Sequence, residues 1–101
     1  MPNKDYYYIA YKILRYLYDC LMRGERPDLS LLEPGIYSIE EYYWSYIFRK
    51  LKEGDYIEGI NEYKKPFKEE TLIRFGPDFN ITPKGIDYLN ENSVFNKGTT
   101  A

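Results

Sequence analysis

Apolar residues near the start of the chain recur at steps of three and four positions, which is the spacing of one face of an α-helix. They are Ala10, Ile13, Leu14, Leu17 and Leu21. Asn3 is a candidate N-cap for this helix, and Asp5 complements the positive end of its dipole. Arg23 and Gly24 form a suitable C-terminus, so the pattern predicts that the first helix ends there.

A second stripe of large side chains runs along the same helix, about 120° around from the centre of the leucine face. It consists of Tyr8, Tyr11, Arg15, Tyr18 and Met22. One interpretation is that these tyrosines are partly exposed and partly covered by the C-terminal segment. The other is that the stripe forms the interface of a homodimer or the contact with another protein. The sequence leaves both interpretations open.

A short leucine-rich segment comes next. Leu29, Leu31 and Leu32 precede Pro34 and Gly35, which predicts one or two helical turns that end at the proline. We expect the chain to turn here and begin another helix.

The second long helix is predicted to begin near Ile39. Ser38 and Glu41 have the spacing of a capping box, in which the Ser38 hydroxyl accepts from the Glu41 amide and the Glu41 carboxylate accepts from the Ser38 amide. Gly54 is expected to end the helix in the left-handed conformation. The predicted core face is Tyr43, Trp44, Ile47 and Leu51, with Phe48 beside them. The predicted opposite face is Glu41, Tyr42, Ser45, Arg49 and Lys52.

The remaining residues predict a β-hairpin and a last helix. Residues 55–63 are expected to form a strand in which Tyr56 and Ile57 contact the core, and the charged residues 62–70 a hairpin loop. Residues 71–75 form the returning strand, which residues 76–78 are expected to stop. Thr82 and Pro83 have the N-cap and first-turn positions of a helix that ends at about residue 92, with Ile86 and Leu89 facing inward.

Length and composition indicate a single packed domain. Of the 101 residues, 44% are apolar and 19% aromatic, including 13 tyrosines. We expect one domain over residues 1–93 and a flexible tail over residues 94–101, in which Val94 and Phe95 are candidates to fold back onto the first helix. Cys20 is the sole cysteine, and no signal peptide or apolar run of about 18 residues is present, which predicts a reduced, cytoplasmic, soluble protein.

The order of predicted elements is helix, short helix, helix, strand, charged loop, strand, helix. This order is typical of an α+β winged helix-turn-helix domain, with three helices, a two-stranded β-hairpin wing and a short C-terminal helix. The helix that begins near Ser38 has the recognition position, and residues 63–69 form the tip of the wing.

Two segments strengthen this interpretation: LKEGDYIEGI at residues 51–60 and NITPKGIDYLNENS at residues 80–93. They resemble the YjcQ-like family of small winged-helix proteins found in Gram-positive bacteria and their phages. The matching positions are Gly54, Tyr56, Ile57, Gly59, Thr82, Lys84, Gly85 and Leu89. The resemblance implies a winged-helix fold whose DNA binding is inferred from architecture, and it supplies no catalytic residues.

Double-stranded DNA is therefore the first candidate partner. Tyr42, Ser45 and Arg49 are the candidate base-contacting residues of the recognition helix, and Lys52 is a candidate phosphate contact. Glu40 and Glu41 in the first turn oppose this assignment because carboxylates repel phosphates. The net charge of −2 also lacks the strongly basic balance of avid DNA-binding domains.

The wing has the stronger cluster of basic residues. Its candidate DNA contacts are Lys64, Lys65, Lys68 and Arg74. Three glutamates balance the three lysines between residues 61 and 70, so the alternative is a charged hairpin tip that discourages edge pairing.

A second function class is a homodimeric protein-interaction module that uses the winged-helix frame as a scaffold, through the tyrosine stripe of the first helix. An enzyme is not expected. The chain has no histidine, and Cys20 lacks a partner base. The sequence indicates no metal, cofactor or small-molecule site and no membrane segment.

Overall fold

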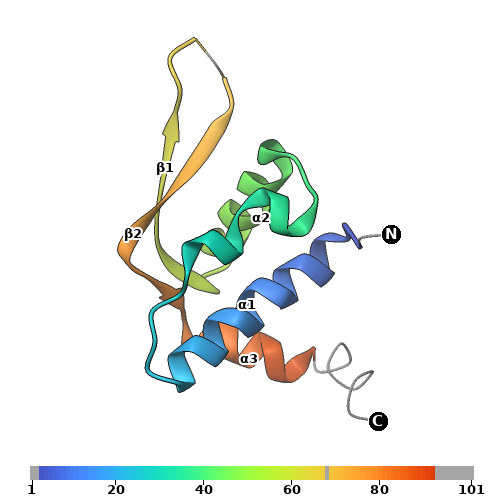
Figure 1. Cartoon of the computed structure of the whole chain (residues 1–101), viewed down its shortest axis with the longest axis vertical. Coiled ribbons are helices and arrows are strands. Elements are labelled where there is room, and N and C mark those ends of the chain that lie inside the picture. Colours follow the sequence, from blue (N-terminus) through green and yellow to red (C-terminus); the bar gives the residue numbers. More distant parts are fainter. Residues whose placement is uncertain (1–2, 68, 93–101) are drawn as a thin grey trace.

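The computed structural model describes residues 3–67 and 69–92. Helix α1 (Tyr6–Met22) is followed by two 3₁₀ helices, η1 (Leu29–Leu32) and η2 (Pro34–Tyr37), and by α2 (Glu41–Glu53). Strands β1 (Ile57–Lys64) and β2 (Thr71–Ile81) form an antiparallel hairpin that leads into α3 (Pro83–Glu91). The architecture is α+β with a winged-helix layout, in the predicted order. Figure 1 shows the hairpin beside α2, with its tip beyond the helices.

One core joins α1, α2, α3 and the base of the hairpin. Its fully buried side chains include Ile13, Leu14 and Leu17 of α1 and Ile47 and Phe48 of α2. Each such side chain contributes about 1.5–3 kcal/mol relative to an exposed one. The expected core faces of both helices are thus largely confirmed.

The prediction for the end of α1 is partly wrong. Leu21 is 44% exposed, and Cys20 is buried in its place. The last turn of α1 extends past the core, so the apolar periodicity continues beyond the last residues that have core side chains to pack against. Arg23 is the C-cap and Gly24 has φ +70°, which confirms the expected C-terminus.

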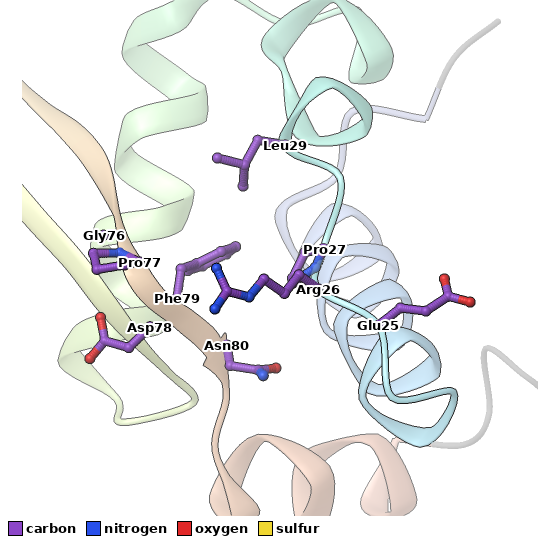
Figure 2. Close-up of a pocket in the computed structure, with 9 residues that line it drawn as sticks. All are labelled: Glu25, Arg26, Pro27, Leu29, Gly76, Pro77, Asp78, Phe79 and Asn80. Atoms are coloured by element: carbon purple, nitrogen blue, oxygen red, sulfur yellow. The ribbon is translucent and has the colours of Figure 1, made fainter.

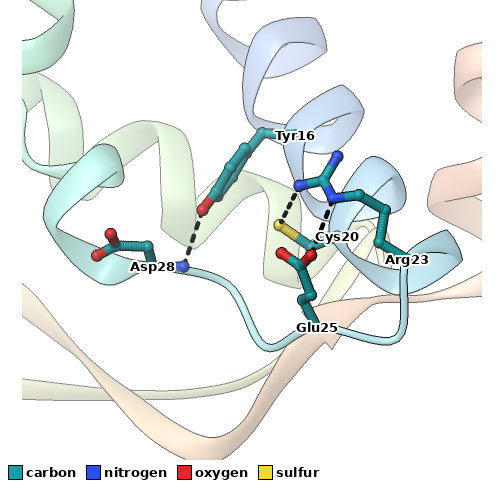
Figure 3. Close-up of polar contacts among 5 residues, drawn as sticks. All are labelled: Tyr16, Cys20, Arg23, Glu25 and Asp28. Carbon is teal, nitrogen blue, oxygen red and sulfur yellow. Dashed lines mark hydrogen bonds and ion pairs between the residues drawn. The ribbon is translucent and has the colours of Figure 1, made fainter.

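The loop after α1 is tied back to the helix by polar contacts (Figure 3). The Tyr16 hydroxyl accepts a hydrogen bond from the Asp28 amide at 2.8 Å. The Arg23 guanidinium donates to the Cys20 sulfur at 3.7 Å and pairs with Glu25 at 3.4 Å. These bonds fix the direction in which the chain enters η1.

The two long helices begin at residues other than the predicted ones. Asp5, not Asn3, caps α1, because its carboxylate accepts from the Tyr8 amide at 3.1 Å while Asn3 accepts from the Asp5 amide. Ser38 does not cap α2. It has φ 57° and closes η2, so the extended Glu40 becomes the N-cap, without a side-chain hydrogen bond.

Gly54 ends α2 for a reason other than the expected one. Its φ is −81°, and the left-handed residue is Asp55, with φ 64°. A Cβ at Gly54 would lie 2.5 Å from Cε2 of Tyr56. Glycine is therefore favoured here because it makes room for the Tyr56 ring.

The hairpin contains an irregularity where the sequence predicts the end of a strand. Strand β2 continues through residues 76–78, and the register passes from Ile60 opposite Phe75 to Glu58 opposite Asn80. A single residue of β1, Gly59, therefore faces residues 76–79 of β2. A bulge of this kind accommodates a proline that a regular ladder would exclude, so the predicted stop is wrong.

Helix α3 begins as the sequence predicts. The Thr82 hydroxyl accepts from the Gly85 amide at 3.1 Å and donates to the Asp55 carbonyl, which fastens α3 to the turn after α2. Leu89 is buried and Ile86 packs against the core, as expected. None of the helices in the described ranges has the length and apolarity needed to cross a membrane. The predicted tail, with Val94 and Phe95, lies outside the described residues.

Candidate nucleic-acid interface

The solvent-facing side of α2 has an aromatic and basic character. Tyr42 is 62% exposed and Tyr46 39% exposed. The Arg49 guanidinium carbon lies 5.8 Å from the centre of the Tyr46 ring, and Lys50 Nζ lies 5.4 Å from it. We call Tyr42, Tyr46, Arg49 and Lys50 the α2 outer stripe. Tyr46 and Lys50 were missed by sequence reasoning, although they follow Tyr42 at steps of four and eight, the spacing of one helix face.

Ser45 was predicted to contact bases, and this prediction is wrong. The residue is 1% exposed, and its hydroxyl has no hydrogen-bond partner among the described residues. Ser45 lies four residues after Glu41 and seven before Lys52, both of which contact the hairpin. It therefore faces the hairpin rather than solvent.

Arg49 lies at the junction between α2 and the hairpin. Together with Tyr42, Glu69, Glu70 and Thr71 it lines a cleft of about 320 Å³. Its Nε is buried and has no hydrogen-bond partner among the described residues. A guanidinium keeps its charge at any physiological pH, so this side chain brings a positive charge to the junction between α2 and the hairpin.

Three lysines around α2 are engaged by carboxylates. Lys52 pairs with Glu62 at 3.8 Å, Lys65 with Glu41 at 4.0 Å, and Lys50 with Glu53 at 3.2 Å. Lys52, the predicted phosphate contact, thus points toward β1. All three pairs are substantially exposed, and such pairs contribute about 0–1 kcal/mol, so other anions can displace them at low cost.

The remaining basic residues of the hairpin do not share one surface. Lys64 is exposed at the end of β1, and Lys68 lies outside the described residues. Arg74 lies over the Tyr63 ring at 4.8 Å. Because it alternates with the buried Ile73, Arg74 points away from α2. Within the described ranges, Arg49, Lys64 and Arg74 have no carboxylate within 4.0 Å.

A tyrosine-lined hollow borders the α2 outer stripe on the side away from the hairpin. Tyr6, Tyr7, Tyr46 and Lys50 line about 360 Å³. The Tyr6 and Tyr46 rings lie 6.3 Å apart, edge to face. Burial, followed by the neighbouring phenols of Tyr88, Tyr46, Tyr7 and Tyr56, raises the pKa of Tyr6 to about 12. The α2 outer stripe is thus flanked by neutral phenols on one side and by the charged hairpin on the other.

The stripe predicted on α1 is only partly at the surface. Tyr11 is 6% exposed and belongs to the core, so its assignment to an interface is wrong. Tyr8 and Tyr18 are half-buried and pack against the core. Arg15 pairs with Asp19 at 3.0 Å, and Met22 is exposed. The core extends further around α1 than the leucine positions indicate.

A separate cleft lies on the far side of the hairpin base. The loop after α1 and the β2 irregularity enclose about 280 Å³, lined by Glu25, Arg26, Pro27, Leu29, Gly76, Pro77, Asp78, Phe79 and Asn80. Figure 2 shows the Arg26 side chain extending from this loop toward Phe79. The cleft shares no residue with the α2 outer stripe.

Comparison with known proteins places the chain in a family. A family model described as YjcQ protein matches residues 11–101. No curated protein and no solved structure matches the chain. The family match includes α2, the hairpin and α3 in full.

Proposed function

We propose that this chain, which belongs to the YjcQ family, binds double-stranded DNA, with α2 in the major groove and the hairpin along the phosphate backbone. The observation that supports this proposal most strongly is the position of the Arg49 guanidinium, which lies beside the Tyr46 ring on the face of α2 that also carries the exposed Tyr42.

The dimensions of α2 suit the groove. Its 13 residues extend about 20 Å, and a helix with side chains is about 10–12 Å wide. The major groove is about 12 Å wide, so it admits one helix and leaves phosphates on both sides. The hairpin tip, which extends beyond the helices in Figure 1, is well placed to meet one of these strands.

The residues divide into base-contacting and phosphate-contacting groups. Arg49 is the candidate for a bidentate contact with guanine, and Tyr42 and Tyr46 are candidates for contacts with base edges and thymine methyl groups. Lys64 and Lys65 are the candidate phosphate contacts.

Charge limits the expected affinity. Glu41, Glu69 and Glu70 lie beside the proposed interface, and the chain has a net charge of −2. Phosphates would have to displace the exposed lysine–glutamate pairs. We therefore expect affinity for an arbitrary duplex at roughly 10⁻⁴–10⁻⁶ M, decreasing steeply as salt increases.

Fluorescence anisotropy with a labelled duplex tests the proposal. Arg49→Ala should weaken binding to a preferred duplex about 5- to 150-fold, the range of one bidentate contact. Arg26→Ala is the matched control, since it removes the same charge from an exposed loop outside the proposed interface. Circular dichroism verifies that both variants are folded.

Two outcomes would contradict the proposal. One is the absence of any duplex binding at low salt. The other is an equal loss of affinity in Arg49→Ala and Arg26→Ala, which would mean that only total charge matters.

A further inference from the structure

The outer side of α1 carries a line of charged residues with a large side chain at each end. Tyr8, Lys12, Arg15, Asp19 and Met22 follow one another at steps of four, three, four and three. This spacing places the five residues on one face of the helix, with Tyr8 and Met22 at its ends and three charged residues between them. We call these residues the α1 outer stripe, and we propose that it pairs with the α1 outer stripe of a second copy of this chain, antiparallel and around a twofold axis.

The order of charges selects this arrangement. In an antiparallel pair centred near Arg15, residues 12 and 19 of opposite copies face each other, so that Lys12 meets Asp19 twice across the interface. Parallel pairing would instead place Lys12 against Lys12 and Asp19 against Asp19. The stripe is therefore complementary to itself only in the antiparallel direction.

The ends and the centre of the stripe are compatible with the same pairing. Met22 is exposed and would face Tyr8 of the second copy, and a thioether beside an aromatic ring is a favourable contact. Arg15 would lie near the twofold axis, close to the same residue of the second copy. Its pairing with Asp19 at 3.0 Å keeps the guanidinium charge compensated there.

An exposed apolar rim lies beside the α1 outer stripe. Leu31 and Ile36 border a groove of about 290 Å³ whose other residues include Tyr16 and Tyr37, and Ile36 is 56% exposed. The twofold axis would pass between the two α1 helices, perpendicular to both. The η1–η2 segments of both copies would therefore lie on the same side of the α1 pair. Their apolar rims would then cover each other, which removes exposed apolar surface from water.

Sedimentation equilibrium of the full chain, with designed charge reversals, tests the pairing. In the dimer, Lys12→Glu places a carboxylate opposite Asp19 at both of the equivalent contacts. Asp19→Lys places an ammonium group opposite Lys12 at both. Each variant alone should dimerise roughly tenfold more weakly than the original chain. Lys84→Glu, a reversal at an exposed position on α3, is the control and should leave association unchanged.

The mixture of the two variants distinguishes this dimer from any other. A Lys12→Glu chain facing an Asp19→Lys chain regains both opposite-charge contacts, so the mixture should associate about as tightly as the original chain. Thermal unfolding of each variant confirms that the fold is intact. The proposal is overturned if the original chain is monomeric at high micromolar concentration, or if the mixture associates no better than either variant alone.

Discussion

Replacing Gly59 by alanine should strongly destabilise the base of the hairpin. Gly59 has φ +84°, a conformation that costs a non-glycine residue about 1–3 kcal/mol. A Cβ there would lie 2.5 Å from both the backbone nitrogen and Cα of Phe79, and 2.7 Å from the carbonyl carbon of Asp78. These are backbone atoms of the facing strand, so no side-chain rotation can relieve the contact.

The two costs add because they have different origins. Overpacking at a site of this kind costs about 1–3 kcal/mol, so the total loss of unfolding free energy is roughly 2–6 kcal/mol. A domain of this size has about 5–15 kcal/mol in total. With a urea dependence of about 1.5 kcal/mol per molar, a loss of 3 kcal/mol lowers the unfolding midpoint by about 2 M.

Urea unfolding followed by circular dichroism measures this loss. Gly35→Ala is the matched control, because a Cβ at Gly35 meets nothing within 4 Å. Its stability should stay within about 0.5 kcal/mol of the original chain. The reasoning is refuted if Gly59→Ala has the same midpoint as Gly35→Ala, since β1 and β2 would then not approach each other as closely as described.

Three further predictions concern single polar contacts. Trp44→Phe should lower the free energy of unfolding by about 1–3 kcal/mol beyond the loss of packing, because the buried Leu32 carbonyl loses its 2.6 Å hydrogen bond from the indole. Urea unfolding measures this loss. Thr82→Ala should cost about 0.5–2 kcal/mol, again by urea unfolding, through loss of the α3 cap. The hydroxyl and the amide of Ser30 donate hydrogen bonds to the Asp28 carboxylate and hold its pKa below the ordinary value of 3.8. The stabilisation from these hydrogen bonds is therefore present above pH 3.8, and it is lost as the pH falls through the lowered pKa of Asp28. Carboxyl NMR titration should show Ser30→Ala moving this pKa upward.

Periodicity was sufficient to predict the elements and most of the core. The three- and four-residue steps identify α1 and α2, and Thr82 followed by Pro83 locates the start of α3. These signals are local, since they depend on helix geometry and on which backbone groups a nearby side chain can reach. They could not locate Tyr11, whose burial depends on elements that pack around α1 from elsewhere in the chain.

Three incorrect predictions show how surrounding structure overrides the preference of a short sequence pattern. Ser38 has the right spacing for a capping box, but the preceding 3₁₀ turn places it in the left-handed region. Pro77 has the local preference of a strand breaker, but the irregular register opposite Gly59, which is distant in sequence, accommodates it within β2. Ser45 is polar yet faces the hairpin. At Pro77 and Ser45 a tertiary contact overrides the local preference, whereas at Ser38 the adjacent 3₁₀ turn does.

The candidate site was harder to predict than the fold. Sequence reasoning placed Tyr42 and Arg49 on the outer face of α2 but did not predict which carboxylates pair with the lysines of α2 and the hairpin. The pairing of Lys52 with Glu62 and of Lys65 with Glu41 depends on how the hairpin lies against α2. Such pairs follow from the tertiary arrangement and leave no signal in the local pattern.

Amide chemical-shift mapping during titration with duplex DNA tests the proposed interface most directly. If α2 enters the major groove, the largest changes should occur at Tyr42, Tyr46 and Arg49, with a second set at Lys64 and Lys65. These changes should diminish as salt is added, because phosphate contacts release counterions. Saturable DNA binding with changes confined to α1 or the loop after it, and with α2 unperturbed, would contradict the account.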